Sequence, residues 1–569
     1  MRNLRWLVLI AVGGLLLVVG ILLSQTPVLQ SNAPLPASGG AHVEALIGSP
    51  VRLNPILDFN NQVDEDVDQL LYRGLVRFDD RGQPVPDLAA QLAVSADTKL
   101  VTVTLRDDAF WHDGEPVQAA DVVYTFAKIQ EEGYPGPADL QAFWSEINVV
   151  LLDERTVQFQ LPEPFAPFLD FLSVGLLPDH LLRGVSAADL PDHPFHLEPV
   201  GTGPFRFDRY LTEDGQIVGV SLLKNDDFYG QVPYLDRVEF HYFEDQASAL
   251  AAYQSGEVGA IGSVGPSILP EVLAAPNLNL HSMRQAEVKL IYLNLANSEL
   301  AFLAEKDVRQ SLTYAINRQA LIDLQLGGQG IVATGPILPG TWAFAEGLEP
   351  VPYDPIGAGH LLDQAGWEIP VGANPGAEEY VRTNNESQLR FSLLHGDTPT
   401  DSAIAERVQS YWAAIGIQVE LEPVAPNELQ EALEEREFEA VLTDLVLSRW
   451  PDPDPYPMWH DSQAESGQNY ASFEDRNTGI WLERARVSPD QARRAELYAS
   501  FQYRFQDQAP VVLLFHPVYN YAISADMLGV SIGPLYDPSA RFVNIELWHL
   551  RTRRGPAPDP SEAPPSPAP

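Results

Sequence analysis

The sequence predicts an α/β protein with more than one domain. Stretches that alternate apolar and polar residues, as strands do, take turns with stretches whose apolar residues recur at helical spacing. Within residues 238–261 a strand, a helix and a short strand follow one another directly, which is a β-α-β pattern. At 569 residues the chain is too long for one hydrophobic core, so we expect two or three domains.

Charge and cysteine content exclude several classes of function. The formal net charge of −43 disfavours a nucleic-acid surface and an anionic membrane surface, because both carry negative charge. The simplest interpretation of this charge is solubility. The chain has no cysteine, which excludes disulfides, thiolate metal sites, thiol nucleophiles and attachment through a lipid-modified cysteine.

The N-terminal segment resembles a membrane anchor. Arg2 and Arg5 precede an unbroken apolar run, residues 6–23, which as a helix reaches roughly 27 Å, about the hydrocarbon thickness of a bilayer. The basic residues should stay in the cytoplasm, so the rest of the chain is expected outside it. Because the run is long and no clear cleavage site follows it, we expect an uncleaved signal anchor, with a cleaved signal as the alternative.

The first half of the chain after this run predicts three extended segments and two helices. Residues 43–47 are extended. Residues 67–78 predict a helix that turns at Gly74. Asp121 is expected to cap a helix that begins with residues 122–126. The alternating residues 100–106 and 156–161 predict half-buried strands.

A glycine turn stands at residues 199–207. Gly201 and Gly203 bracket a threonine, and Pro204 follows, so we expect a tight turn that glycine's conformational freedom allows, and then an extended segment. The turn lacks the third glycine of a dinucleotide-binding motif, and no helix pattern opens behind it.

The second half alternates strands and helices more regularly. One helix places Val308, Leu312 and Ile316 on one face, and a later helix around Val408 and Trp412 stops at Gly416. The predicted strands cover residues 238–243, 256–261, 289–295, 417–421 and 438–447, and a helix covers 246–255.

Five motifs in order resemble one family. They are Leu-Tyr-Arg-Gly-Leu at residues 71–75, Trp-His-Asp-Gly at 111–114 with Ala-Asp-Val-Val at 120–123, Gly-Thr-Gly-Pro-Phe at 201–205, Asp-Val-Arg-Gln-Ser-Leu at 307–312, and Ala-Ile-Asn-Arg at 315–318. Together they resemble the extracytoplasmic solute-binding proteins of peptide-type ABC transporters, the family 5 group with oligopeptide, dipeptide and nickel binders. The resemblance covers nearly all of residues 42–552.

The resemblance implies a type II periplasmic-binding-protein fold, in which hinges join two lobes and an additional domain is inserted in the first lobe. The glycine turn would then be where the chain re-enters lobe I. The expected divisions are 1–24 signal anchor, 25–41 flexible spacer, 42–84, 199–286 and 512–552 lobe I, 85–198 inserted domain, 287–511 lobe II, and 553–569 disordered proline-rich tail.

The function that the resemblance implies is capture of a small solute, foremost a peptide, between the lobes and its delivery to the permease subunits of an ABC importer. We expect a monomer that touches the membrane only through its N-terminal helix, binds no nucleic acid and uses no cofactor. No catalytic motif of a familiar kind is present, so the chain is not expected to be an enzyme. The alternatives are a secreted hydrolase with a carboxylate pair, and a sensor or chaperone that keeps the fold without transport.

A proline-rich loop after residues 438–447 carries most of the candidate ligand contacts. Four prolines stiffen it, which lowers the ordering cost of binding. The resemblance implies an aspartate here for a peptide's α-ammonium group, but that position falls at Arg449 or Pro451. Either Asp452 or Asp454 substitutes for it, or the ligand lacks an amine. The alternative is that the loop residues only cap and pack a turn. The candidates are Arg449, Trp450, Asp452, Asp454, Tyr456, Trp459 and His460.

Two further strands supply tyrosines. Tyr519 and Tyr521 follow an apolar run that resembles the family's return strand, and period two allows both rings to share one face. Tyr292 and Asn294, at the start of lobe II, are also candidates. Core packing is the alternative for these residues.

The histidines offer a weaker metal hypothesis. His180, His193 and His196 lie close in sequence, but without cysteine or a clear further ligand we expect no metal site. His112 is expected to be structural.

Overall fold

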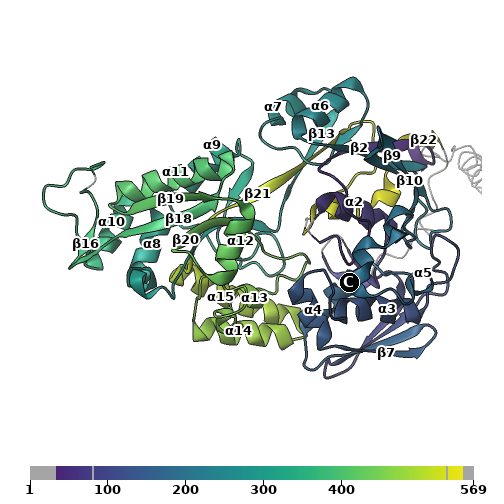
Figure 1. The fold of residues 1–569 in the computed structure, drawn as a ribbon, viewed down its shortest axis with the longest axis horizontal. Coiled ribbons are helices and arrows are strands. Elements are labelled where there is room, and N and C mark those ends of the chain that lie inside the picture. Colours follow the sequence, from purple (N-terminus) through teal and green to yellow (C-terminus); the bar gives the residue numbers. More distant parts are fainter. Residues whose placement is uncertain (1–33, 60, 80–81, 378, 534–535, 555–569) are drawn as a thin grey trace, which may run out of the picture.

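The computed structural model describes residues 34–59, 61–79, 82–377, 379–533 and 536–554. Two lobes lie side by side along the long axis of the molecule (Figure 1). Lobe I, on the right in the figure, contains β2 (Ala41–Ile47), β9 (Phe205–Glu213), β10 (Gln216–Lys224), β11 (Arg237–Phe243) and β12 (Ala260–Ile261). Lobe II contains β14 (Glu287–Leu293), β18 (Arg390–Gly396), β19 (Gln418–Val424) and β20 (Ala440–Val446).

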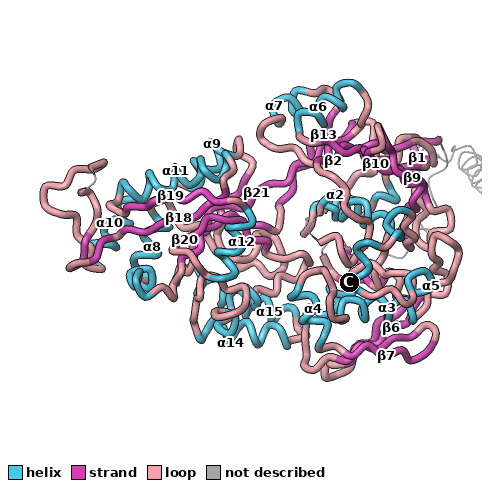
Figure 2. Tube along the Cα trace, viewed as in Figure 1, coloured by secondary structure: helices cyan, strands magenta, loops and turns pink. Residues whose placement is uncertain are grey.

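One hydrogen-bonded sheet runs through both lobes. Among the described residues twelve strands belong to it, in the order β19-β18-β20-β14-β21-β12-β2-β11-β10-β9, with β13 (Leu278–Arg284) and β15 (Gly330–Val332) pairing with β21 (Val511–Ser524). The predicted β-α-β unit is confirmed: β11, α6 (Gln246–Ser255) and β12 follow one another, and both strands pair in parallel with β2. Figure 2 shows β21 passing between the lobes.

The connection between the lobes is made of two neighbouring strands. β21 pairs with β14 in lobe II through residues 511–515 and with β13 through residues 518–524. The chain also crosses between Arg284, the end of β13, and Glu287, the start of β14. The β21 crossing is extended backbone that pairs with β15 and β13 through residues 515–518, whereas residues 285–286 between β13 and β14 form a short bend outside both strands.

A smaller antiparallel sheet packs into the core of lobe I. Its strands have the order β5-β6-β8-β7. Phe126 and Phe159 of this region belong to the same apolar cluster as Leu222 of the larger sheet and Leu70 of the helix that follows β2. The elements of this region are β3 (Val76–Phe78), β4 (Pro84–Pro86), β5 (Ala89–Val94), β6 (Leu100–Leu105), α3 (Ala119–Gln130), α4 (Ala138–Ser145), β7 (Asn148–Asp153), β8 (Thr156–Gln160), η1 (Ala166–Ser173), α5 (Asp179–Leu182), η2 (Ala187–Asp192) and η3 (Pro194–Leu197).

In lobe II helices cover both faces of the sheet. β14 alternates accordingly: Ile291 and Leu293 pack with one set of helices, whereas Val288, Leu290 and Tyr292 pack with the other. The first set is η4 (Ser298–Ala304), α8 (Lys306–Tyr314), α9 (Arg318–Gln325), α10 (Pro355–Gln364) and α11 (Pro399–Ala414). The second is α12 (Pro426–Glu435), α13 (Tyr456–Trp459), α14 (Arg476–Val487) and α15 (Gln491–Gln508).

The remaining elements are α7 (Leu269–Ala274), β16 (Thr383–Asn384), β17 (Ser387–Gln388), η5 (Asp461–Gln463), η6 (Pro538–Phe542) and η7 (Ile545–Leu547).

Two local predictions in the first half need correction. The helix expected over 67–78 is α2, Gln62–Leu71, because Asn61 caps it with its side chain on Val63 N (3.0 Å) and residues 76–78 form β3 instead. Asp121 is not the cap of α3; it lies in the first turn, and its carboxylate accepts from the N–H of Gln118, the residue before the helix (2.8 Å). The capping-box geometry explains the three-residue error.

The turn at residues 199–207 requires glycine because its backbone packs directly against the backbone of another element, and not because of an unusual backbone angle. A Cβ on Gly201 would lie 1.9 Å from the Leu71 carbonyl oxygen, and one on Gly203 would lie 2.1 Å from that of Leu70, so the turn packs directly on the end of α2. His112 holds it: its Nδ1 accepts from Gly201 N (3.1 Å), and its Nε2 donates to the Gly203 carbonyl (3.1 Å). These bonds agree with the structural role expected for His112.

The two chain ends of the described structure meet. β1 (Pro34–Ala37) pairs antiparallel with β22 (Arg551–Arg554), so residues 34–37 of the expected spacer form a strand. The expected signal anchor, residues 1–24, lies outside the described residues. Within the described ranges we find no helix with the length and apolar character needed to cross a bilayer.

Candidate functional site

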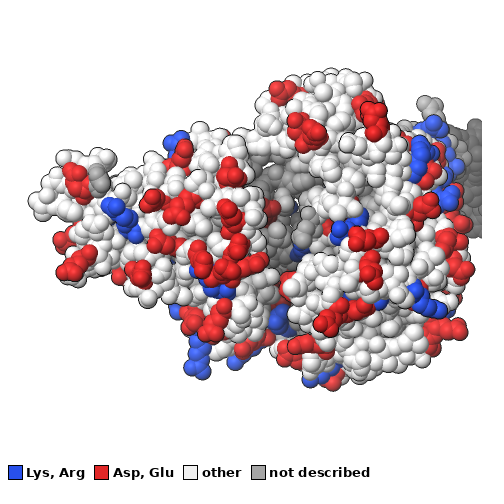
Figure 3. Space-filling view, in the orientation of Figure 1, with Lys and Arg blue, Asp and Glu red and all other residues white. Residues whose placement is uncertain are grey.

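A cavity of about 250 Å³ lies between the lobes. Its walls come from α2, β3, η6 and the end of η1 on the lobe I side and from Arg449, Trp450 and Pro451 on the lobe II side. At about 30 Å³ per water molecule it has room for roughly eight waters, or one small solute. Figure 3 shows the surface hollowed between the two lobes.

Helix α2 supplies most of the charge near this cavity. Its apolar residues Val63, Val67 and Leu70 are buried in the core of lobe I. Its acidic residues divide into two sets. Two of them are bound within the protein: Asp64 accepts from the backbone N–H groups of Val51 and Arg52 at 2.8 to 3.1 Å, and Asp66 pairs with Arg541. The other two, Glu65 and Asp68, line the cavity.

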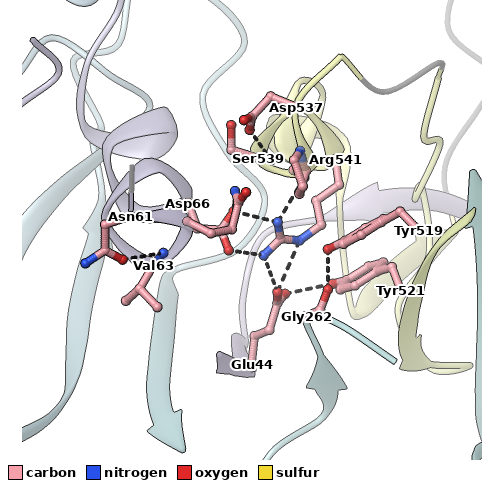
Figure 4. A network of polar contacts seen from close by, with 12 residues as sticks. Glu44, Asn61, Val63, Asp66, Gly262, Tyr519, Tyr521, Asp537, Ser539 and Arg541 are labelled. Atoms are coloured by element: carbon pink, nitrogen blue, oxygen red, sulfur yellow. Dashed lines mark hydrogen bonds and ion pairs between the residues drawn. The ribbon is translucent and has the colours of Figure 1, made fainter. Parts of the chain in front are cut away.

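A buried ion-pair network fixes the wall formed by α2 and η6. Arg541 is completely buried and binds Glu44 of β2 (2.7 Å) and Asp66 of α2 (2.6 Å), as Figure 4 shows. Tyr521 donates to Glu44 (2.8 Å), and the hydroxyl of Tyr519 donates to the Gly262 carbonyl. Four elements, β2, α2, β21 and η6, are thereby held in one place.

Four carboxyl groups crowd the lobe I wall of the cavity: Asp58, Glu65, Asp68 and Asp537. Burial, with the nearby charge of Asp537, raises the pKa of Asp58 to about 7. Burial, followed by the charges of Asp537 and Asp58, raises the pKa of Glu65 to about 10. Burial and the neighbouring Asp58 and Asp64 also raise the pKa of Asp68 well above its usual range. Glu65 therefore holds its proton at neutral pH, and Asp58 is about half protonated there.

Direct contacts join the lobes next to the cavity. Arg449 donates to the Phe59 carbonyl (2.6 Å) and lies 3.5 Å from Glu65. Trp450 packs on Phe171, with ring centroids 4.2 Å apart. The backbone N–H of Asp452 donates to the Asp170 carboxylate (3.0 Å), and burial together with the Asp452 charge raises the pKa of Asp170 to about 8. The cavity is thus closed on this side by the proline-rich loop.

Comparison with known protein families adds the decisive observation. Residues 83–468 match the model of the bacterial extracellular solute-binding proteins, family 5 (middle region). The chain belongs to this family. The match spans more than half of the chain and includes four of the five motifs that carried the resemblance.

Curated relatives agree with this assignment. The oligopeptide-binding protein AppA of Bacillus subtilis is 26% identical over 530 residues, which is 92% of this chain and 93% of that protein. The dipeptide-binding protein of Escherichia coli is 28% identical over 524 residues, covering 88% and 93%. The nickel-binding periplasmic protein of Escherichia coli is 27% identical over 475 residues, covering 80% and 85%.

A solved structure supports the architecture. AppA from Bacillus subtilis, in complex with a nonapeptide, superposes with a TM-score of 0.71 at 25% identity, covering 91% of this chain and 100% of that one. The predicted two-lobed α/β fold of this solute-binding protein is therefore confirmed.

Two of the eleven predicted site residues line the cavity of this solute-binding protein, Arg449 and Trp450. The two aspartates of the loop are bound by arginines of lobe II. Asp452 forms a bidentate pair with Arg494 (2.5 and 2.7 Å), and Asp454 pairs with Arg486 (2.9 Å). Neither carboxylate is therefore free to face a ligand in this conformation.

The other loop residues pack within lobe II. Tyr456 stacks on His460 at 4.1 Å and receives the Arg486 guanidinium over its ring at 4.2 Å. Trp459 is buried against Phe505, and His460 shares a hydrogen bond with Ser462 (2.8 Å). These contacts order the loop that carries Arg449 and Trp450.

The strand residues also lie outside the cavity wall. Tyr292 is buried between Trp459 and Tyr470, and Asn294 donates to the carbonyls of Arg436 and Phe438 (3.2 and 3.0 Å). Tyr519 and Tyr521 do share one face, but that face belongs to the network around Glu44.

The sequence reasoning missed the acidic wall. Asp58, Glu65 and Asp68 lie in a stretch with five acidic residues between positions 58 and 68, a density that could have drawn attention to it. Asp537 could not be found this way, because only the tertiary fold brings η6 beside α2.

The histidines have protein partners. His180 lies 2.8 Å from Asp113, and His196 lies between the carbonyls of Leu190 and Leu53 (2.6 and 3.3 Å). Within the ranges that the structure covers, no group of three or more His, Cys, Asp or Glu side chains is arranged to hold a metal ion.

Proposed function

We propose that this protein captures a small solute, with a short peptide as the first candidate, and delivers it to the permease of an ABC importer outside the cytoplasm. The observation that carries this proposal is a cavity walled by both lobes, in a chain that belongs to the family of extracellular solute-binding proteins. The relatives named as oligopeptide- and dipeptide-binding proteins support the peptide.

A ligand between the lobes stabilises their closed arrangement by contacts that the open arrangement lacks. Arg449 and Trp450 are the proposed lobe II contacts, since they line the cavity and also meet lobe I. The permease then distinguishes the loaded from the empty protein by the relative position of the lobes.

Attachment and oligomeric state are part of the same proposal. Arg2, Arg5 and the apolar run at 6–23 support an uncleaved anchor that keeps the receptor at the membrane. We propose a monomer, because one chain supplies both walls of the cavity.

The direct test is to identify the solute. Native mass spectrometry of freshly purified protein should show a bound small molecule, and calorimetry with that molecule should give one site per chain. Deleting the gene should abolish uptake of the same solute. Turnover of peptides or glycans by the purified protein, or uptake that survives the deletion, would contradict the proposal and favour a hydrolase or a sensor.

A further inference from the structure

The charge of the cavity wall is unbalanced. Among the described residues that line it are six acidic ones and three arginines. Arg73 is bound to Glu546 (2.6 Å) and lies 3.9 Å from Asp87 of the wall. Arg449 lies 3.5 Å from Glu65, and Arg77 is exposed, so Asp58 and Asp68 have no arginine partner among the described residues. The acids of the proline-rich loop do not contribute, since both are paired. The excess negative charge therefore comes from lobe I.

Asp68 shows that this charge lacks a partner. Its side chain is 3% exposed, and no donor of a described residue lies in hydrogen-bond geometry with either carboxylate oxygen. The Asp58 carboxyl and the Asn54 backbone interact with it, but neither supplies a countercharge. A buried carboxylate without a donor is costly, so such a group points to a ligand that supplies one. Asp58, on the same wall, is 8% exposed.

The rest of the wall suits an organic cation better than a metal ion. Phe59, Tyr72, Trp450 and Tyr536 line the cavity, and aromatic faces attract ammonium and guanidinium groups as well as apolar chains. Within the described ranges, these acids do not form a group of three or more that could hold a metal ion.

We propose that the cavity selects solutes that carry an ammonium or guanidinium group on an apolar body, and that Asp58 and Asp68 of lobe I receive this charge. The inference rests on the proposed function, because it names the solute class of the same cavity. The cation can belong to a free amine or to the basic side chain of a short peptide.

Protons and the solute compete for these carboxyl groups. Asp58 faces Asp68, Asp64 and Asp537, and Glu65 faces Asp537, Asp58 and Arg449, so an entering cation displaces protons from this set. Affinity should rise as the pH increases through about 7, where Asp58 loses its proton. Binding should release protons, which calorimetry detects as a dependence of the heat on the buffer.

The test uses matched pairs of probes on the full protein after its bound solute has been removed. Phenethylamine is compared with 2-phenylethanol, and N-acetyl-lysyl-alaninamide with N-acetyl-norleucyl-alaninamide, so that only one member of each pair carries an ammonium group. We expect the cationic member to bind about tenfold or more tightly than its neutral partner. The pair that shows the larger ratio distinguishes a free amine from a peptide side chain.

Substitutions of single carboxyl groups test which of them pairs with the cationic group of the solute. Asp68→Asn should weaken the cationic probe about tenfold or more, because an amide cannot become the negative charge that pairs with the cation. It should not lower the melting temperature, since no donor of a described residue lies in hydrogen-bond geometry with this carboxyl group. Glu132→Gln, at an exposed site away from the cavity, removes the same charge and should change neither. If Asp68→Asn fails to fold, Asp58→Asn and the pH series on the unmodified protein provide the same comparison.

Two outcomes would overturn the inference. Equal or tighter binding of the neutral probes, unchanged in Asp68→Asn, removes the charge selectivity and leaves the proposed transport function intact. Failure of every probe to bind also overturns it. The proposed function is contradicted by separate results: no solute in native mass spectrometry, turnover by the purified protein, or uptake that survives the gene deletion.

Discussion

Arg541 shows how one side chain can set the geometry of a binding wall. The guanidinium lies where β2, α2 and η6 meet and is bound by two carboxylates that belong to different segments. A buried arginine in this position is not a source of large net stability, because both charges lose their hydration. Its effect is to fix where Asp58, Glu65 and Asp537 stand relative to one another.

Arg541→Met should destabilise the protein by about 3 to 5 kcal/mol, because it leaves Glu44 and Asp66 buried without their countercharge. Urea denaturation monitored by tryptophan fluorescence measures this loss. Arg209→Met is the control: Arg209 is 55% exposed, so its pair with Asp208 should matter by less than about 1 kcal/mol. Equal losses in the two variants would contradict the role given to the network.

His112 is the second residue whose chemistry can be tested. Burial lowers its pKa from the ordinary value of 6.5 to about 4, and the hydrogen bond from its ring to the Gly203 carbonyl opposes this shift only in part. Between these values the unfolded chain binds a proton that the folded chain does not, so this contribution to stability is lost as the pH falls.

The difference in unfolding free energy between the native protein and His112→Gln should therefore shrink between about pH 6.5 and about pH 4, by roughly 1 to 3 kcal/mol. Comparing the two proteins cancels the titration of the acidic groups and of His516, which both share. A difference that stays constant over this range would show that His112 is not neutral in the fold.

At the scale of elements, much of the fold could be predicted because periodicity and length carry the information. The helix at 246–255, the strands near 43–47 and 238–243, and the stop at Gly416 agree with the structure within a residue or two. The ends of α2 and α3 were misplaced, because capping side chains decide them and several acids compete for that position. Residues of the site were harder to predict, since contact across lobes is not encoded locally.

The glycine turn connects two elements by backbone contact. Gly203 N donates to the Leu71 carbonyl (2.8 Å), and Gly201 and Gly203 both lie against the last turn of α2. Any side chain at these positions pushes the helix end, and with it Tyr72 and Arg73 of the cavity wall.

Gly203→Ala should cost about 1 to 3 kcal/mol or more, because its Cβ would overlap the Leu70 carbonyl. It should also weaken solute binding. Gly259→Ala is a matched control, since the nearest atom to its Cβ is 3.7 Å away and its backbone angle suits alanine. Thermal unfolding and calorimetry test both effects; the prediction fails if the two variants behave alike.

At the scale of the whole molecule, solute binding and lobe closure are one equilibrium. Trp450 and Phe171 are the aromatic contact between the lobes at the cavity, and an aromatic pair of this kind contributes about 0.5 to 1.5 kcal/mol. Removing it should therefore favour the open arrangement.

Trp450→Ala should increase the radius of gyration of the solute-free protein in small-angle X-ray scattering and weaken solute binding up to about tenfold. Tyr353→Ala serves as control, because Tyr353 is 47% exposed on lobe II and away from the cavity. An unchanged radius and affinity in Trp450→Ala would mean that the lobes are held together by other contacts.

The paired crossings of β21 and of the β13–β14 segment restrict what closure can look like. A strand rises about 3.3 Å per residue and is already close to its full length, so it can twist and bend but cannot stretch. The two connections therefore let the lobes rotate relative to each other, but they keep the two lobes at a fixed distance where the chain crosses. Inserting residues into both connections should let the lobes close around a larger solute. The same insertions should make the relative position of the lobes less defined, and a permease that recognises this position should then bind the protein more weakly.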